Sequence, residues 1–166
     1  DGVDNFTYTL RDRDGDTDPA NLSFQVSNDI DYTPEIVKPA VEIVDETNLA
    51  GGVITETGTV TANFFGDGPG TFLANNSFTS SGSRLNNALT HNGVAVNVTL
   101  AGNTYTGMAG GVKVFELVLN TNGSYTFKLF EQLDHANGSD PNDIINLNFG
   151  IEATDCDGDK TQTVLV

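Results

Sequence analysis

Two short stretches of the sequence place three carboxylates within five residues. "DRDGD" at residues 12–16 and "DCDGD" at residues 155–159 share the pattern D-x-D-G-D. Calcium takes about six to eight oxygen ligands, and a glycine lets the backbone bend so that alternating carboxylates reach one side of a turn. The pattern therefore predicts calcium ligands at both turns, which are Asp12, Asp14, Asp16, Asp155, Asp157 and Asp159.

The same pattern has a simpler interpretation, because aspartate and glycine are ordinary turn formers. That interpretation is enough for a single Asp-Gly pair. Three carboxylates that occur twice favour calcium, since without a cation their charges repel one another over a few ångströms. An EF-hand also requires a glycine at its sixth position and a glutamate at its twelfth, and this sequence has neither. We therefore expect calcium sites built on hairpin turns.

The charge of the chain limits its partners. It carries 23 acidic and 7 basic side chains, which gives a formal net charge of −16 at pH 7. Nucleic acids and anionic membranes require a positive patch, and the sequence has no basic run. No stretch approaches the roughly 18 apolar residues of a membrane span. We therefore expect neither nucleic-acid binding nor direct membrane contact, and the acidity suits a protein that collects cations.

Alternation of large apolar and polar residues, rather than helical periodicity, runs through the chain. Turn residues separate the alternating runs, as in "LVLNTNGSYTFKL", where Asn122-Gly123 is a strong hairpin signal. The pattern predicts an all-β antiparallel sandwich of about eight or nine strands. The alternating runs lie at residues 6–10, 41–44, 52–65, 94–100, 112–119, 124–130, 145–154 and 161–166.

The two acidic turns belong to a longer internal repeat. Phe6 begins "FTYTLRDRDGD" and Phe149 begins "FGIEATDCDGD", and the two copies align without a gap at an offset of 143 residues. An offset of this size is typical of tandem repeats of a whole domain. Because the chain opens directly in a strand pattern with no signal peptide, we expect it to be a piece of a longer protein.

The repeat predicts the domain boundaries. Residues 1–28 are expected to be a terminal hairpin derived from a preceding repeat, residues 29–40 an acidic linker whose prolines stop strand pairing, and residues 41–166 one domain. A two-stranded hairpin with an apolar face is not stable alone in water, so we expect it to pack on the sandwich or on a neighbouring chain. Its apolar face consists of Phe6, Tyr8, Leu10, Leu22, Phe24 and Val26.

Further acidic residues are expected to complete the calcium site at residues 155–159. A turn before the last strand lies at the end opposite the C-terminus, and in a sandwich with an odd number of strands the chain enters at that end. The linker residues Asp29 and Asp31, with Asp45 or Glu46 at the domain start, are therefore predicted to complete the ligand shell.

A second acidic loop, "LDHANGSDPND" at residues 133–143, offers Asp134, Asp140 and Asp143. These residues fit another calcium ion, and they equally fit ordinary loop hydrogen bonding. Asp67 in "GDGPG" is a weaker candidate, because it is a single carboxylate between glycines.

Several segments in their order along the chain carry a resemblance to a known family. They are "VDETNL", "GDGPGTF", "VFELVLNTNGSYTFKL", "LDHANGSDPNDIINLNF" and "ATDCDGDKTQTVLV". With these segments the chain resembles the 143-residue repeat of giant type I secreted RTX adhesins of Gram-negative bacteria. The resemblance implies an immunoglobulin-like extender domain, bound calcium, an extracellular location at the bacterial cell surface, and a mechanical role in adhesion or biofilm formation.

The sequence does not favour an enzyme. It has no nucleophile motif, its two histidines are far apart in turns, and it has no tryptophan to stack sugar rings. Two functions remain. The first is a structural extender whose partners are neighbouring repeats of the same polypeptide and whose ligand is Ca²⁺. The second is a calcium-dependent module that binds a carbohydrate or a peptide.

Overall fold

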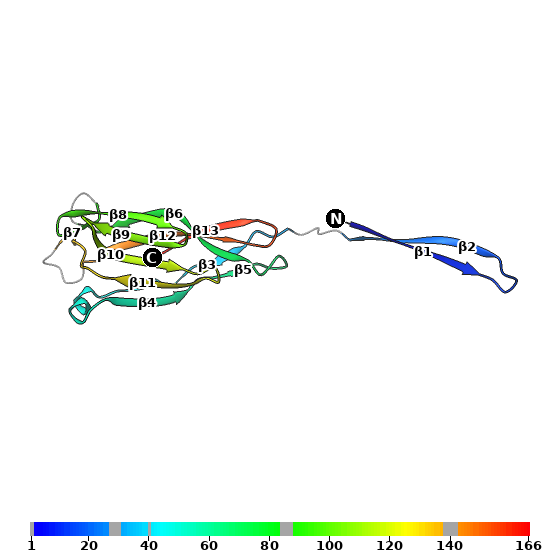
Figure 1. The fold of residues 1–166 in the computed structure, drawn as a ribbon, viewed down its shortest axis with the longest axis horizontal. Helices are drawn as coiled ribbons and strands as arrows, with labels where there is room; N and C mark the ends of the chain where they lie inside the picture. The colour runs from blue at the N-terminus through cyan, green and yellow to red at the C-terminus, as the bar shows by residue number, and fades with distance from the viewer. Residues whose placement is uncertain (1, 27–30, 40, 84–87, 138–142) are drawn as a thin grey trace. The chain divides into compact units, whose positions relative to one another are not determined.

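The computed structural model describes residues 2–26, 31–39, 41–83, 88–137 and 143–166 (Figure 1). The chain forms two compact units, Asp1–Asp31 and Tyr32–Val166. We call the first unit the N-terminal hairpin and the second the sandwich unit. The predicted all-β class is confirmed, with 60% strand and 4% helix.

The N-terminal hairpin consists of β1 (Gly2–Arg11) and β2 (Thr17–Val26), which pair antiparallel in a two-stranded sheet. Its two faces differ in polarity because side chains alternate along a strand. Phe6 lies opposite Leu22 on one face, and on the other face the Thr7 hydroxyl donates a hydrogen bond of 2.8 Å to Asn21. The hairpin therefore has one apolar and one polar face.

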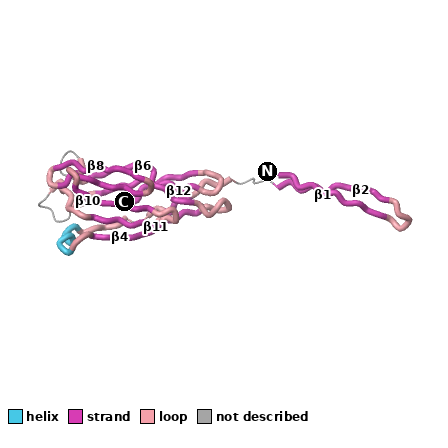
Figure 2. The backbone as a smooth tube through the Cα atoms, viewed as in Figure 1, coloured by secondary structure: helices cyan, strands magenta, loops and turns pink. Residues whose placement is uncertain are grey.

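The sandwich unit contains a six-stranded and a three-stranded antiparallel sheet, whose strands are magenta in Figure 2. The larger sheet has the order β4-β11-β10-β9-β8-β7 and the smaller one the order β13-β12-β6. The bounds in the larger sheet are Ile54–Thr59 (β4), Thr90–His91 (β7), Val94–Ala101 (β8), Thr104–Ala109 (β9), Val112–Leu119 (β10) and Ser124–Leu129 (β11). Those in the smaller sheet are Thr71–Ser81 (β6), Asn146–Thr154 (β12) and Lys160–Leu165 (β13).

The core lies between these two sheets. Alternate residues of β10 and β12 point inward, and among them Phe115 and Ile151 are fully buried. The rings of Phe115 and Phe149 meet edge to face across the interface at 5.8 Å between centroids. The buried Tyr105 hydroxyl donates to the carbonyl of Gly150 at 2.8 Å, which satisfies the polar end of this large side chain.

Part of the predicted linker over residues 29–40 belongs to the sandwich unit and contains a strand. Residues Glu35–Val37 form a strand, β3, that pairs antiparallel with β5 (Thr61–Asn63). Pro34 and Pro39 flank this strand instead of preventing it, because a short edge strand leaves proline outside the ladder. The added short strands β3, β5 and β7 and the hairpin strands raise the total above the expected eight or nine.

Helical structure in the described residues is limited to η1 (Glu46–Gly51), a 3₁₀ helix. The Asp45 side chain caps it by accepting a hydrogen bond from the backbone N–H of Thr47. None of the helices described is both long and apolar enough to cross a membrane.

Candidate metal centre

The two acidic turns have the same backbone geometry. In the first turn one Asp12 oxygen accepts the amides of Gly15 and Asp16 at 3.1 and 2.9 Å. In the second turn one Asp155 oxygen accepts the amides of Gly158 and Asp159 at 3.0 and 2.7 Å. Each turn also requires a left-handed glycine, with φ of 105° at Gly15 and 107° at Gly158. The D-x-D-G-D sequence thus specifies one turn structure at both places.

In the first turn the three predicted carboxylates lie together. Oxygen atoms of Asp12, Asp14 and Asp16 are all within 4.8 Å of one another, and all three side chains are exposed. A side-chain hydrogen bond with Asp14 and the backbone amides of the turn hold the pKa of Asp12 below its usual range, against a smaller effect of desolvation. The Asp12 carboxyl therefore ionises more readily than an ordinary aspartate.

The second turn differs because its first aspartate is buried. Asp155 is 7% exposed, and its Oδ2 atom is buried with no hydrogen-bond donor among the described residues. Burial raises the pKa of Asp155, but hydrogen bonds with the Asp157 side chain and the turn amides outweigh it, so the pKa lies below its usual value. An ionised oxygen without a donor is costly in a protein interior, because nothing replaces the water that it has lost.

The strand register brings a further carboxylate to the second turn. Thr71 at the start of β6 pairs with Thr154 at the end of β12, so the loop before β6 lies beside the turn after β12. The Cys156 amide accordingly donates to the Asp67 carbonyl at 3.0 Å. A carboxylate oxygen of Asp67 lies within 4.8 Å of one of Asp157.

Asp67 is thus the site residue that the sequence interpretation underrated. The signal for it was the position of "GDGPG" directly before one strand and of "DCDGD" directly after another. These two stretches become neighbours only because the strands β6 and β12 pair with each other. The approach is so close that a Cβ atom on Gly70 would lie 2.4 Å from the Thr154 carbonyl oxygen.

The sandwich unit begins at the end that carries the second acidic turn, residues 155–159. The Tyr32 amide donates to Asp67 Oδ2 at 3.3 Å, and the Tyr32 ring stacks on Phe65 at 4.9 Å between centroids. The predicted place of chain entrance is therefore confirmed. Asp31 precedes Tyr32 by one peptide bond, and Asp29 lies outside the described residues.

The prediction that Asp45 or Glu46 completes this site is wrong. After β3 the chain runs along the sandwich to η1, which lies at the opposite end of the unit from the β12–β13 turn (Figures 1 and 2). There Asp45 caps η1, and Glu46 accepts the Leu133 amide at 3.0 Å and pairs with His135 at 3.4 Å. The prediction assumed that the whole start of the domain stays at the end where the chain enters. About ten extended residues span roughly 30 Å, which is enough to reach the other end of the unit.

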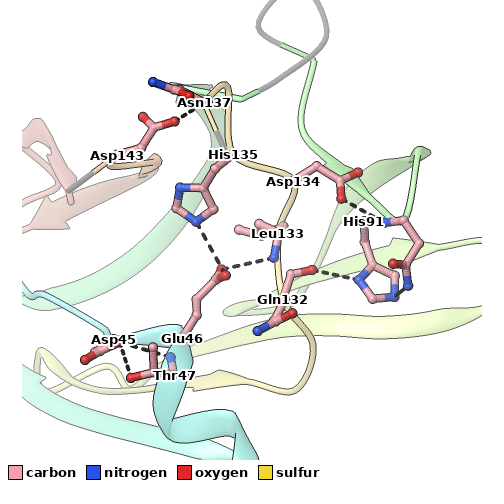
Figure 3. Close-up of polar contacts among 11 residues, drawn as sticks. Asp45, Glu46, Thr47, His91, Gln132, Leu133, Asp134, His135, Asn137 and Asp143 are labelled. Carbon is pink, nitrogen blue, oxygen red and sulfur yellow. Dashed lines mark hydrogen bonds and ion pairs between the residues drawn. The ribbon is translucent and has the colours of Figure 1, made fainter. Parts of the chain in front are cut away.

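The second acidic loop uses its carboxylates to hold loops together, as Figure 3 shows. The two Asp134 oxygens accept the amides of Asn92 and Gly93 at 3.1 and 2.7 Å. Asp143 accepts the amide of Asn137 at 2.6 Å. Asp140 lies outside the described residues. In the described part of the chain, Asp134, Asp143, Asp155 and Asp159 belong to no group of three or more carboxylates within 4.8 Å.

The donor set at the second turn fits a hard cation. Asp155 supplies a buried oxygen without a donor, and the Asp67–Asp157 pair concentrates negative charge beside the turn. Calcium prefers carboxylate and carbonyl oxygens and tolerates irregular loop geometry, whereas zinc prefers nitrogen and sulfur. Cys156 is exposed, and its Sγ donates to the Pro69 carbonyl at 3.2 Å. The candidate ligands at this turn are therefore oxygen atoms.

Comparison with known proteins gives one match. A model of the family described as Domain of unknown function (DUF5801) matches residues 42–165. No curated protein and no solved structure matches the chain.

Proposed function

The chain belongs to the DUF5801 family, whose description assigns no activity, and we propose that it is a non-catalytic extender repeat of a large bacterial surface adhesin. In this proposal the immunoglobulin-like domain is one unit in a string of repeats outside the cell, secreted by a type I pathway. The string projects a distal ligand-binding domain for adhesion or biofilm formation. Its partners are neighbouring repeats, and calcium stiffens it.

The geometry of the acidic turns is the observation that carries the proposal. The same turn recurs at an offset of 143 residues with matching hydrogen bonds, and its buried copy contains an oxygen that no described donor satisfies. A calcium ion would replace the missing donors at Asp155. Turn formation by aspartate and glycine accounts for the bonds to the backbone amides but not for this oxygen.

We assign the ligands of the second site to Asp155, Asp157 and Asp67, with Asp159 in the same turn. Asp31, one peptide bond before Tyr32, stays a predicted ligand from the linker. A ligand from that position would restrict bending where the sandwich unit begins. Asp12, Asp14 and Asp16 form the equivalent site of the N-terminal hairpin, and calcium at Asp140 and Asp143 stays a prediction.

The alternative, a calcium-dependent module that binds a carbohydrate or peptide, has less support. The sandwich unit has an apolar cavity of about 260 Å³, but its lining includes Glu46 of η1 and the residues that contact it, Leu133 and His135 (Figure 3). The η1 helix lies at the end of the unit away from the second acidic turn. A ligand held there would not contact the proposed calcium. Carbohydrate recognition also relies on polar groups, and this lining is mainly aliphatic and aromatic.

Small-angle X-ray scattering of the full chain tests the stiffening. We expect a narrower distribution of intramolecular distances in about 10 mM calcium than in chelator, a concentration well above typical extracellular calcium affinities. Asp155→Asn should remove the difference, and Asp134→Asn, in the other acidic loop, should keep it. Identical scattering with and without calcium, from a protein that binds the ion, would reject the mechanical role and leave the metal site intact.

A further inference from the structure

The N-terminal hairpin and the hairpin β12–β13 are equivalent in register. Phe6 lies opposite Leu22 in one, and Phe149 lies opposite Leu165 in the other. These pairs are related by the same 143-residue offset as the acidic turns, and the identities phenylalanine and leucine are kept. The two hairpins are therefore equivalent in strand pairing and in the positions of their apolar side chains.

The surroundings of β12–β13 show what such a hairpin needs. The outer edge of β12 pairs with β6, with Ile151 opposite Ala74 and Ala153 opposite Phe72. Its inner face is covered by the larger sheet, which leaves Phe149 and Leu165 only 4% and 3% exposed. One hairpin thus needs a β6 strand at its edge and a six-stranded sheet over its face.

Within its own compact unit, the described part of the N-terminal hairpin leaves its apolar face exposed. Phe6 is 55% exposed and Leu22 is 47% exposed, although their counterparts are buried. In the described residues β1 pairs with β2 and with no other strand, so its second edge offers unpaired backbone groups. An apolar face beside an open edge is a surface for strand addition.

We propose that this surface docks onto an upstream copy of the sandwich, in the place that β12–β13 fills in the present one. The edge of β1 pairs with the upstream β6, and Phe6, Tyr8, Leu10 and Leu22 complete the upstream core. The inference rests on the repeat arrangement of the proposed function but not on calcium. In this arrangement each folded repeat ends with a hairpin of the β1–β2 type, and the linker to the next repeat follows that hairpin.

The upstream copy is expected to differ from this one around three positions. Thr7 takes the position of Gly150, where an added Cβ atom would clash with Asn75 and Ser77 of the present body. Tyr8 takes the position of Ile151 and Leu10 that of Ala153, so both inward side chains are larger in the N-terminal hairpin. Protein cores are close-packed and do not accept added volume freely. The natural upstream core must therefore have smaller residues facing Tyr8 and Leu10, and a body with the present core will fit this hairpin with reduced stability.

A longer chain tests the docking directly. Because residue 1 is equivalent to residue 144, residues 32–143 can be joined in front of residues 1–166 without changing the repeat register. The upstream body then has only β1–β2 to complete it. In a matched control chain, residues 144–166 replace residues 1–23. Cys156→Ser is included in every copy, since serine retains the hydrogen-bond donor of that side chain.

Cysteine cross-linking is the measurement. Directly opposite residues of adjacent strands lie within disulfide reach, so Tyr8→Cys should oxidise with Ala74→Cys of the upstream body as readily as Ile151→Cys does in the control chain. Thr7→Cys, on the polar face, should not. Cross-linking should be the same in calcium and in chelator, so it separates this inference from the proposed function.

Two results would overturn the inference. One is an upstream body that stays unfolded with β1–β2 but folds in the control chain, as judged by cooperative thermal unfolding. The other is a folded upstream body in which the Tyr8 pair gives no more disulfide than the Thr7 pair.

Discussion

The hairpins β1–β2 and β12–β13 share a register, a turn and a pattern of apolar side chains, yet one has an exposed apolar face and the other lies in the core. Phe6 and Phe149 are the same residue at equivalent positions, with exposures of 55% and 4%. Asp12 and Asp155 accept equivalent backbone amides, but only Asp155 is buried. Local sequence therefore sets the hairpin and its turn, whereas neighbouring strands decide burial.

This difference matters for the acidic turns. The first turn gathers three exposed carboxylates, which water can solvate. The second adds the 64–70 loop, so that the Asp155 carboxylate loses water without gaining a donor for Oδ2. The same five-residue pattern is thus a solvated cluster in one place and a stronger candidate for cation binding in the other.

The largest expected effect is the difference in stability loss between replacing Phe149 and replacing Phe6 by alanine. Phe149→Ala should lower the free energy of unfolding of the sandwich unit by about 3–5 kcal/mol, because it leaves a cavity in a closed core. Phe6→Ala in the same chain should cost less than about 1 kcal/mol, since this side chain is half exposed. Urea unfolding followed by tyrosine fluorescence measures both values. Equal losses would show that the two hairpins have equivalent surroundings in solution.

Removal of calcium should have the next largest effect. A site filled at 100 times its dissociation constant adds about 2.7 kcal/mol, which corresponds to a change in Tm of about 5–10 °C for a domain of this size. Chelator should therefore lower the Tm by that amount in a calorimetric scan. Magnesium should not restore it, because it favours a tight octahedral shell and retains its waters.

Asp155→Asn should lower the Tm far more in saturating calcium than in chelator. Its remaining oxygen can still accept the amides of Gly158 and Asp159, so the turn is kept, while a carboxylate is removed from the proposed site. A smaller loss is expected in chelator, because the hydrogen bonds that hold the pKa of Asp155 below its usual value then lose their charged partner. Thermal scans in both buffers measure the two differences. Equal losses in calcium and in chelator would show that Asp155 does not bind the ion.

The smallest expected effect is the contribution of Asp134, in the second acidic loop, to stability at acid pH. Burial raises the pKa of Asp134, but the amides of Gly93 and Asn92 and the Thr90 side chain together lower it below the usual 3.8. The folded state then binds this proton less readily than the unfolded state, so the stability that it adds is present above pH 3.8 and is lost as the pH falls through the lower folded value.

Asp134→Asn should therefore reduce the slope of stability against pH below about pH 4. Urea unfolding at a series of pH values measures that slope. Glu131→Gln, an exposed neighbour in the same loop, is the matched control. An unchanged slope in the Asp134 variant would show that Asp134 does not contribute to the loss of stability in acid.

Much of the fold could be predicted from local sequence, because strand alternation and Asx-Gly turns are local signals. The hairpin over Val112–Leu119 and Ser124–Leu129 is an example, with Gly123 at a positive φ of 87°. The identical turns at Asp12 and Asp155 are another. These features depend on residues within a few positions of one another, which the sequence displays directly.

The composition of the site could not be predicted in the same way. Asp67 reaches Asp157 only because Thr71 pairs with Thr154, a contact between strands that are far apart in sequence. Asp45 and Glu46 were assigned to the wrong end because the path of residues 35–39 and 41–44 along the sandwich has no local signature. Long-range pairing, rather than residue type, decides which carboxylates share a site.

The most direct test of the central claim is a calcium titration of the ¹⁵N-labelled full chain by NMR, followed at individual amides. The Gly158 amide, which donates to Asp155, should shift saturably with an affinity of about 10⁻⁴ to 10⁻³ M. The Ser124 amide, which donates to Asn122 in the turn before β11, should not move. A Gly158 resonance that stays in place up to about 10 mM calcium would contradict a metal centre at the second acidic turn.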